Sequence, residues 1–165
     1  AADIPIMLYN VPSRTGISLL PQTVAELAKI PNIVSIKEAS GSLDQVSQIL
    51  DLCDINVLSG DDSLTLPMMA VGASGVVSVA ANVVPAKVAG LCAAFRAGDL
   101  EEAREIHYEL FPLFKALFIE TNPMPVKAAL ARMGLIENVL RLPLTPMLPD
   151  KFAQLEKVLK KLGVV

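Results

Sequence analysis

The sequence predicts an α/β fold with parallel strands, built as half of a (β/α)8 barrel and followed by a helical region. Short, nearly continuously apolar runs alternate with amphipathic helical runs over residues 1–98, and this order specifies parallel strands with right-handed crossovers. After residue 98 only helical patterns remain. The chain is 53% hydrophobic and its mean hydropathy is +0.52, which is apolar for a domain of this size.

Each strand-like run is short and rich in β-branched residues, as is typical of strands buried on both faces. The four runs span residues 5–10, 32–37, 55–60 and 75–81. Helical runs follow them at residues 20–30, 42–53, 63–73 and 85–98. Pro21 and Pro85 stand where a first helical turn tolerates proline, and Gly98 stands where a helix ends.

The second half of the chain is expected to be helical at residues 99–121, 123–134 and 149–163, with a Pro-rich extended connector at 141–149. We therefore predict two domains, a half barrel over residues 1–98 and a helical domain over residues 99–165. Four strands cannot close a barrel that needs eight, and an open doubly wound sheet is the alternative. No glycine-rich phosphate-binding motif follows a strand, so nucleotide binding has no support. The high hydropathy favours a half barrel, whose cut edges would expose strands meant to be paired.

Composition excludes several classes of function. The net charge of −3 gives no basic footprint for nucleic acid. The most apolar window, residues 73–95, is interrupted by Pro85 and Lys87, so it does not provide the roughly 20 apolar residues of a membrane span. Cys53 and Cys92 lie far apart within helical patterns and suggest core residues in a reducing compartment rather than a disulfide.

The stretch VSIKEASG, residues 34–41, ends an apolar strand in Lys37. Strict alternation would place Lys37 on one face with Ile33 and Ser35, and Val34, Ile36 and Glu38 on the other. Ligands of α/β folds bind at the carboxyl ends of strands. Apolar walls there would disfavour the ammonium form, and a neutral amine can form a Schiff base with a ketone. The alternative is a structural lysine paired with a neighbouring carboxylate.

Two further side chains lie on the rim after the first strand. Tyr9 stands at the carboxyl end of that strand and could relay protons, although a buried tyrosine with a satisfied hydroxyl is the alternative. Arg14 follows in a loop bounded by proline and glycine. Its guanidinium fork matches a carboxylate, although surface arginines are usually only solvated.

The SGDD stretch, residues 59–62, ends the third strand. Its paired aspartates could hold a divalent metal, but Asp62 or Ser63 is also a natural N-cap for the helix that follows. His107 is the only histidine and lies within a charged helical pattern. A zinc site based on histidines or a Ser-His triad therefore cannot be built from this chain.

Three motifs together resemble the dihydrodipicolinate synthase family: YNVPSRTG (9–16), IKEASG (36–41) and NPMPVK (122–127). This family belongs to the pyruvate-dependent class I aldolases, which include N-acetylneuraminate lyase. The resemblance runs the whole length of the chain and implies the C-terminal half of a TIM (β/α)8 barrel, strands five to eight. It implies that Lys37 is the Schiff-base lysine, that Tyr9 relays protons and that Arg14 binds the carboxylate of the second substrate. Val77 matches a position whose backbone carbonyl faces the lysine.

The resemblance implies a lyase that condenses pyruvate with L-aspartate-4-semialdehyde to 4-hydroxy-tetrahydrodipicolinate, in lysine and diaminopimelate biosynthesis. It implies no cofactor and no metal, because the imine acts as the electron sink, and a cytoplasmic homotetramer. Three alternatives remain. One is another pyruvate-dependent aldolase, such as N-acetylneuraminate lyase or a 2-keto-3-deoxy sugar acid aldolase. Another is a metal-dependent aldolase that uses Asp61 and Asp62, and the third is an inactive half barrel that only assembles with partners or itself.

The chain departs from the family in length, since the family's chains are nearly twice as long. The resemblance implies that four βα units are absent here. Those units carry the threonine motif that binds the pyruvate carboxylate, a second tyrosine and the lysine-feedback site. The sequence opens one turn before a strand, without an initiator Met or signal peptide, which suggests a chain cut within the fold. The isolated chain is therefore not expected to be an active monomer.

Overall fold

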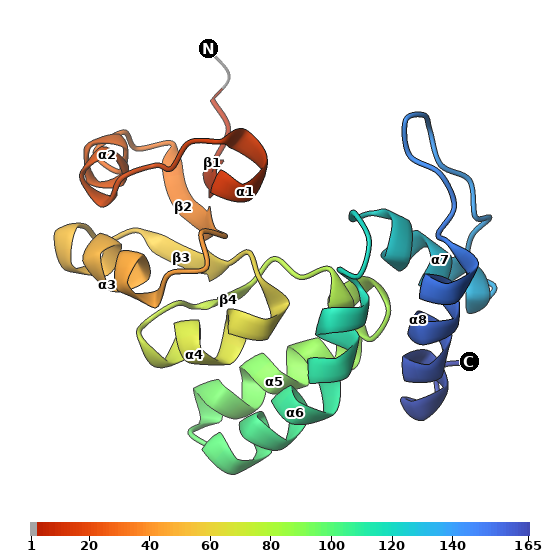
Figure 1. Ribbon diagram of the computed structural model, residues 1–165. Helices are drawn as coiled ribbons and strands as arrows, with labels where there is room; N and C mark the ends of the chain where they lie inside the picture. The colour runs from red at the N-terminus through yellow and green to blue at the C-terminus, as the bar shows by residue number, and fades with distance from the viewer. Residues whose placement is uncertain (1–2) are drawn as a thin grey trace. The chain divides into compact units, whose positions relative to one another are not determined.

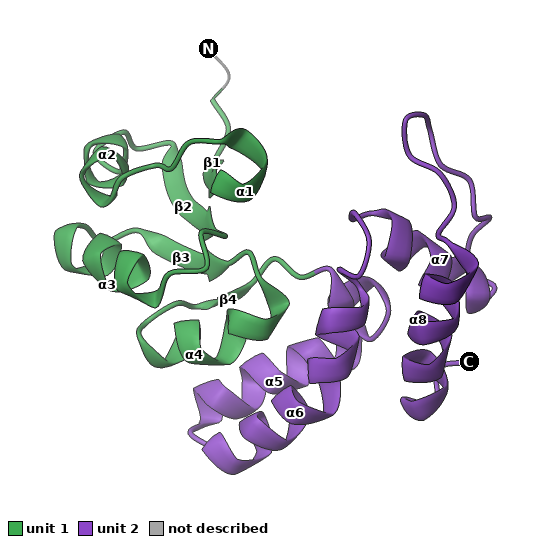
Figure 2. Cartoon of the chain, in the orientation of Figure 1, with its two compact units in different colours: residues 1–78 green, residues 79–165 purple. Residues whose placement is uncertain are grey.

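The protein, described here by a computed structural model of residues 3–165, consists of two compact units. Unit 1 covers residues 1–78 and unit 2 covers residues 79–165 (Figure 2). Within residues 3–165, the strands and the helices between them belong to unit 1, whereas the regular elements of unit 2 are all helices (Figure 1).

Unit 1 alternates strands with helices. Its elements are β1 (Ile6–Asn10), α1 (Pro12–Thr15), α2 (Pro21–Leu27), β2 (Ile33–Glu38), α3 (Leu43–Leu52), β3 (Asn56–Ser59), η1 (Asp62–Leu64), α4 (Thr65–Ala70) and β4 (Gly75–Val76). The four strands form one sheet in the order β1-β2-β3-β4, and every pair of neighbours is parallel. The predicted α/β fold with a parallel sheet is therefore confirmed.

The second strand does not alternate strictly, because the β1–β2 register shifts at its start. Ile6 pairs with Ile33, but Met7 pairs with Ser35, so Val34 bulges out between the two pairs. Val34 is exposed, and Ile33 packs with Ile36 on the helix-covered face. The prediction that Ile33 shares a face with Lys37 is thus wrong at this residue, since an extra residue in one strand reverses the faces that precede it.

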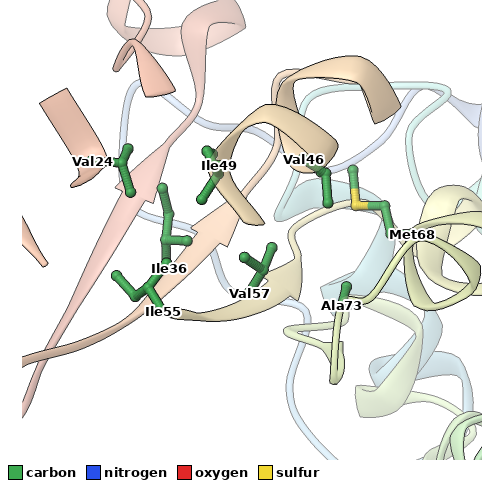
Figure 3. Close-up of a cluster of buried hydrophobic side chains, with 8 residues drawn as sticks. All are labelled: Val24, Ile36, Val46, Ile49, Ile55, Val57, Met68 and Ala73. Carbon is green, nitrogen blue, oxygen red and sulfur yellow. The ribbon is translucent and has the colours of Figure 1, made fainter. Parts of the chain in front are cut away.

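The core of unit 1 lies between one face of the sheet and helices α2, α3 and α4 (Figure 3). Its buried members are Val24, Ile36, Val46, Ile49, Ile55, Val57, Met68 and Ala73. Ile36 is fully buried at the centre of β2, where burial of a side chain of this size stabilises the fold by about 1.5–3 kcal/mol. This packing fixes which side chains of β1 and β2 point the other way.

The fourth strand is shorter than the 75–81 predicted. It comprises Gly75 and Val76, and Val77 continues the pairing by one bond, with its N–H donating to the carbonyl of Ser59 over 2.8 Å. The chain then turns into η2 (Ala80–Asn82). The N–H groups of Val83 and Val84 both donate to the carbonyl of Ala80, so these residues bond locally instead of extending the strand.

Unit 2 contains η2, α5 (Pro85–Ala97), α6 (Leu100–Ala116), α7 (Met124–Arg132) and α8 (Pro149–Lys161). Asp99 caps α6, accepting a hydrogen bond from the N–H of Glu102 over 3.0 Å. Buried leucines of α6 and α8 supply much of its core: Leu110, Leu113, Leu155 and Leu159. No helix within residues 3–165 has the length and the apolar character that crossing a membrane requires.

Candidate active site

Lys37 and Tyr9 meet at the carboxyl ends of adjacent parallel strands. They are register partners on β2 and β1, and the Lys37 Nζ lies 4.3 Å from the centroid of the Tyr9 ring. An ammonium over an aromatic face is attracted by the negative face of the ring. No ion pair within residues 3–165 includes Lys37, so the alternative of a structural lysine held by a carboxylate has no support from the described residues.

Tyr9 is 48% exposed. The alternative of a buried tyrosine with a satisfied hydroxyl therefore does not describe it. Met7, two residues earlier in β1, is 44% exposed. Both residues alternate with Leu8, which packs against the core cluster, so they lie on the sheet face opposite α2, α3 and α4. This is also the face of Lys37.

Arg14 lies in one turn of helix rather than in an open loop. Pro12 opens α1 at a position where proline is favoured, and Gly16 ends it with φ at +75°, in the left-handed region. The Gly16 N–H donates to the carbonyl of Pro12 over 2.9 Å. The Arg14 side chain is exposed, so its five donors face solvent at the rim that follows β1.

Val77 lies one residue beyond β4 and is 38% exposed. Its N–H is tied to Ser59 of β3, as described above, which leaves its backbone fixed beside the carboxyl end of the sheet. Lys37, Tyr9 and Val77 thus come from the ends of three of the four strands.

Gly60 is a residue of this site that the sequence did not single out. Its N–H donates to the carbonyl of Glu38 over 2.7 Å. A Cβ on Gly60 would lie 2.6 Å from the Cβ of Ala39 and 3.1 Å from the Cε of Lys37. Only glycine therefore fits between the ends of β2 and β3, and the space it leaves borders the stem of Lys37.

Gly60→Ala is expected to lower the free energy of unfolding by about 1–3 kcal/mol, because the added methyl overpacks the end of β2. Thermal unfolding at one fixed protein concentration measures the effect. Gly75→Ala is the matched control, since its Cβ would lie 3.7 Å from the Cδ2 of Leu58, an ordinary contact. Equal stability of the two variants would mean that the strand ends move apart without cost.

The first of the two aspartates after β3 has a structural role in this fold. The N-cap of η1 is Asp61, whose Oδ1 accepts hydrogen bonds from the N–H of Ser63 over 3.2 Å and from its hydroxyl over 3.1 Å. The sequence placed the cap at Asp62 or Ser63, so the prediction of a cap holds but its position is one or two residues late. Among residues 3–165, no three His, Cys, Asp or Glu side chains gather as a metal site would require.

His107 and Cys92 belong to helices of unit 2, and Cys53 follows α3 in unit 1. His107 is buried in α6 of unit 2, and this burial lowers its pKa. Cys92 is buried and Cys53 is half-buried, and burial raises the pKa of both thiols. These environments favour the neutral forms of all three groups, which agrees with roles in packing.

Glu38 is the second residue that the sequence missed. It follows Lys37 in β2, faces the helices and is fully buried. Its carboxylate accepts from the Asn10 Nδ2 over 2.9 and 3.1 Å, from the Gln45 Nε2 over 3.1 Å and from the Ser40 N–H over 2.6 Å. A charged residue at a helix-facing position of an apolar strand was the available signal, because such a group needs buried partners.

Polar side chains at the carboxyl ends of parallel strands, on a sheet whose other face is covered by helices, are the arrangement of active sites in α/β enzymes. The chain belongs to the dihydrodipicolinate synthetase family, whose family model matches residues 1–162.

Known relatives match the chain along its whole length. It is 54% identical over 167 residues to 4-hydroxy-tetrahydrodipicolinate synthase of Pelobacter propionicus, covering 100% of this chain and 58% of that protein. The crystal structure of dihydrodipicolinate synthase from Aquifex aeolicus matches with a TM-score of 0.97 at 51% identity, over 99% of this chain and 57% of that one. A synthase variant described as the first monomeric one matches with a TM-score of 0.96 at 46% identity, over 99% of this chain and 57% of the variant. The chain thus spans a little over half the length of the relatives it matches.

Proposed function

We propose that this chain is the C-terminal part of a 4-hydroxy-tetrahydrodipicolinate synthase. The observation that carries the proposal is the position of Lys37, whose ammonium lies over the Tyr9 ring at the carboxyl end of the sheet, in a chain that is 54% identical to a synthase of that name. The four strands would be strands five to eight of a TIM (β/α)8 barrel.

The domain boundary follows from the same proposal. Helix α5 completes the fourth strand–helix repeat, so residues 1–98 form the half barrel and residues 99–165 form the helical domain. Because α5 packs against α6 within unit 2, the proposed boundary at residue 98 follows the strand–helix repeats and not the division of the chain into compact units.

Lys37 is the proposed nucleophile. Its neutral amine attacks the ketone of pyruvate, water leaves, and an imine joins Nζ to the former carbonyl carbon. Loss of a methyl proton converts the imine to an enamine, and no metal or cofactor is required because the iminium accepts the electron pair. Tyr9 moves protons in these steps, and its exposed ring under Nζ supports that role. Val77 would present its backbone carbonyl toward the lysine.

The second substrate is L-aspartate-4-semialdehyde. The enamine carbon adds to its aldehyde, and the substrate amine then attacks the imine carbon, so that the ring closes and the Lys37 amine is released. Arg14 holds the substrate carboxylate through its guanidinium fork. The enzyme would act in the cytoplasm as a homo-oligomer, a tetramer by resemblance, in lysine and diaminopimelate biosynthesis.

The test uses a full-length chimera, in which the N-terminal part of the Pelobacter propionicus relative that this chain does not span is placed before it. Treatment with pyruvate and borohydride should give one adduct per chain, and peptide mapping should find it on Lys37. Product formation is then compared with L-aspartate-4-semialdehyde, N-acetylmannosamine and short sugar aldehydes. A preference for a sugar aldehyde would make the chain another pyruvate-dependent aldolase. Activity lost on chelation, without any trapped adduct, would indicate a metal-dependent one.

Arg14→Ala in the chimera is expected to raise the KM for the semialdehyde, or lower kcat, by about ten- to a hundredfold, the range of a lost charge-assisted pair. Pyruvate binding should change much less, because the imine forms at the strand end and not on the rim. Steady-state kinetics with each substrate varied in turn measure both effects. Arg104→Ala, an exposed arginine of α6, is the control. An equal loss for both substrates would instead indicate a folding role for Arg14.

A further inference from the structure

The carboxylate of Glu38 belongs to a buried polar network that reaches the segment carrying Arg14. Asn10 and Glu38 end the neighbouring strands β1 and β2 and are register partners. Asn10 is 2% exposed and Glu38 is fully buried. The Asn10 Nδ2 donates to both oxygens of the Glu38 carboxylate and over 3.5 Å to the Ser18 Oγ, and its Oδ1 accepts from the N–H of Leu19 over 3.0 Å. These partners fix which atom of the Asn10 side-chain amide is the nitrogen and which is the oxygen.

Gln45, in the first turn of α3, connects Glu38 to Leu19 a second time. Its Nε2 donates to the carbonyl of Leu19 over 3.0 Å and to the Glu38 Oε2 over 3.1 Å. Both the N–H and the carbonyl of Leu19 are thus held by side chains that also bond Glu38. The Ser40 N–H, at the start of the loop after β2, also donates to the Glu38 carboxylate. All these partners donate to the carboxylate, which suits an ionised acceptor.

Segment 11–20 is also held by a bond from the Asn10 Nδ2 to the Ser18 Oγ over 3.5 Å and by the packing of Leu19 against the core cluster. Within it, α1 is closed by local bonds from Arg14, Thr15 and Gly16 back to Val11 and Pro12. Ser18 and Leu19 connect its far end to the strand ends through Asn10. Arg14 lies between these two residues and β1, so the network limits where its guanidinium can go. Glu38 itself faces away from Lys37 and does not contact the reacting atoms.

We propose that Glu38 is a positioning residue for the second substrate: through Asn10, Gln45 and Leu19 it holds the 11–20 segment so that Arg14 meets the carboxylate of the semialdehyde. This inference rests on the proposed function and deepens it. A buried network of this kind is rigid when every member is satisfied, and precise placement of a substrate clamp contributes to the rate because misplacement is costly.

The first test is Gln45→Met in the chimera, which keeps the length of the side chain but removes both donated bonds. Gln48→Met is the matched control, since Gln48 lies on the same helix and its side chain, among residues 3–165, bonds Asp44 of that helix alone. Trypsin cleavage after Arg14 should become about fivefold faster in Gln45→Met, the effect on local opening of losing the one hydrogen bond that Gln45 makes to the segment itself, at the carbonyl of Leu19. Cleavage after Lys29, an exposed residue outside the segment, is the internal reference and should not change.

Kinetics then separate positioning from a purely structural role. In Gln45→Met the semialdehyde KM should rise about fivefold, in step with the cleavage rate, while the pyruvate KM and the yield of trapped adduct change by less than about twofold. Gln48→Met should leave all of these values unchanged.

Glu38→Gln is the second variant, because it places an amide among three donors and leaves at least one of them opposed. It should raise the semialdehyde KM by more than Gln45→Met does, while the pyruvate KM again changes little. Adding Asn10→Asp exchanges the carboxylate and the amide, so that the new carboxylate can accept from the N–H of Leu19 and from the amide at position 38. In this double variant the semialdehyde KM should return most of the way to its value in the unsubstituted chimera.

The outcomes distinguish the proposals. Unchanged cleavage after Arg14 in both Gln45→Met and Glu38→Gln would overturn the positioning role, and so would faster cleavage with an unchanged semialdehyde KM. An equal rise of both KM values would overturn it as well. If the unsubstituted chimera forms no pyruvate adduct, the proposed function fails and the role of Glu38 in it fails too. The cleavage rates would then still record whether the network holds the segment.

Discussion

Lys37→Ala in the full-length chimera is expected to give no pyruvate adduct with borohydride and to lower kcat by a factor on the order of 10⁴–10⁶, as removal of a catalytic nucleophile does in other enzymes. The reason is chemical, since alanine has no amine to form the imine and the enamine cannot arise without it. Mass spectrometry of the trapped protein and a coupled synthase assay measure the two effects.

Lys37→Arg sharpens this prediction. Arginine keeps a cation that can lie over the Tyr9 ring, but its guanidinium stays protonated and does not form the imine. The variant should therefore fold as the unsubstituted chimera does and yet form no adduct. Lys29→Ala, an exposed lysine paired with Glu26 over 2.7 Å, is the control and should be trapped normally. An adduct on another lysine, or an undiminished yield in Lys37→Ala, would refute the assignment.

Much of the fold could be predicted because its signals are local. Proline at the first turns of α2 and α5, and glycine after α5, marked helix boundaries that the structure matches within a residue. The apolar runs gave the order of parallel strands. The length of β4 could not be predicted this way, because the residues after Val76 are as apolar as a strand, and only the local bonds to Ala80 turn them away from the sheet.

The site was predictable to a smaller extent. Tyr9 and Lys37 stood out because polar side chains end apolar strands, but their contact at 4.3 Å depends on the register of β1 and β2. That register includes the bulge at Val34, which no residue pattern marks. Gly60 was missed because its role is a close approach between two strands, and Glu38 was missed because its partners come from β1 and α3. Long-range pairing decides all of these features.

The 165-residue chain on its own is expected to show no synthase turnover and to migrate as a species larger than a monomer. The sheet has two edges, β1 and β4, and the face opposite the helices exposes Met7 and Tyr9. Unpaired strand edges and exposed apolar faces favour association. Under the proposed function, the groups that bind the pyruvate carboxylate also lie outside this chain. Size-exclusion chromatography with light scattering, beside a synthase assay, measures both properties.

A charged substitution on the exposed face of the sheet distinguishes association through the sheet from nonspecific aggregation. Met7→Lys should shift the chain toward the monomer, because a lysine on an edge strand opposes pairing with another sheet. Ile30→Lys is the control, since Ile30 is 49% exposed, against 44% for Met7, but lies outside the sheet. It should leave the assembly unchanged. Co-expression with the missing part of the relative should give both a defined complex and turnover. A monomer of the chain alone that turns over both substrates would show that the four strands described here carry the complete chemistry, and the proposed dependence on a second half of the barrel would be wrong.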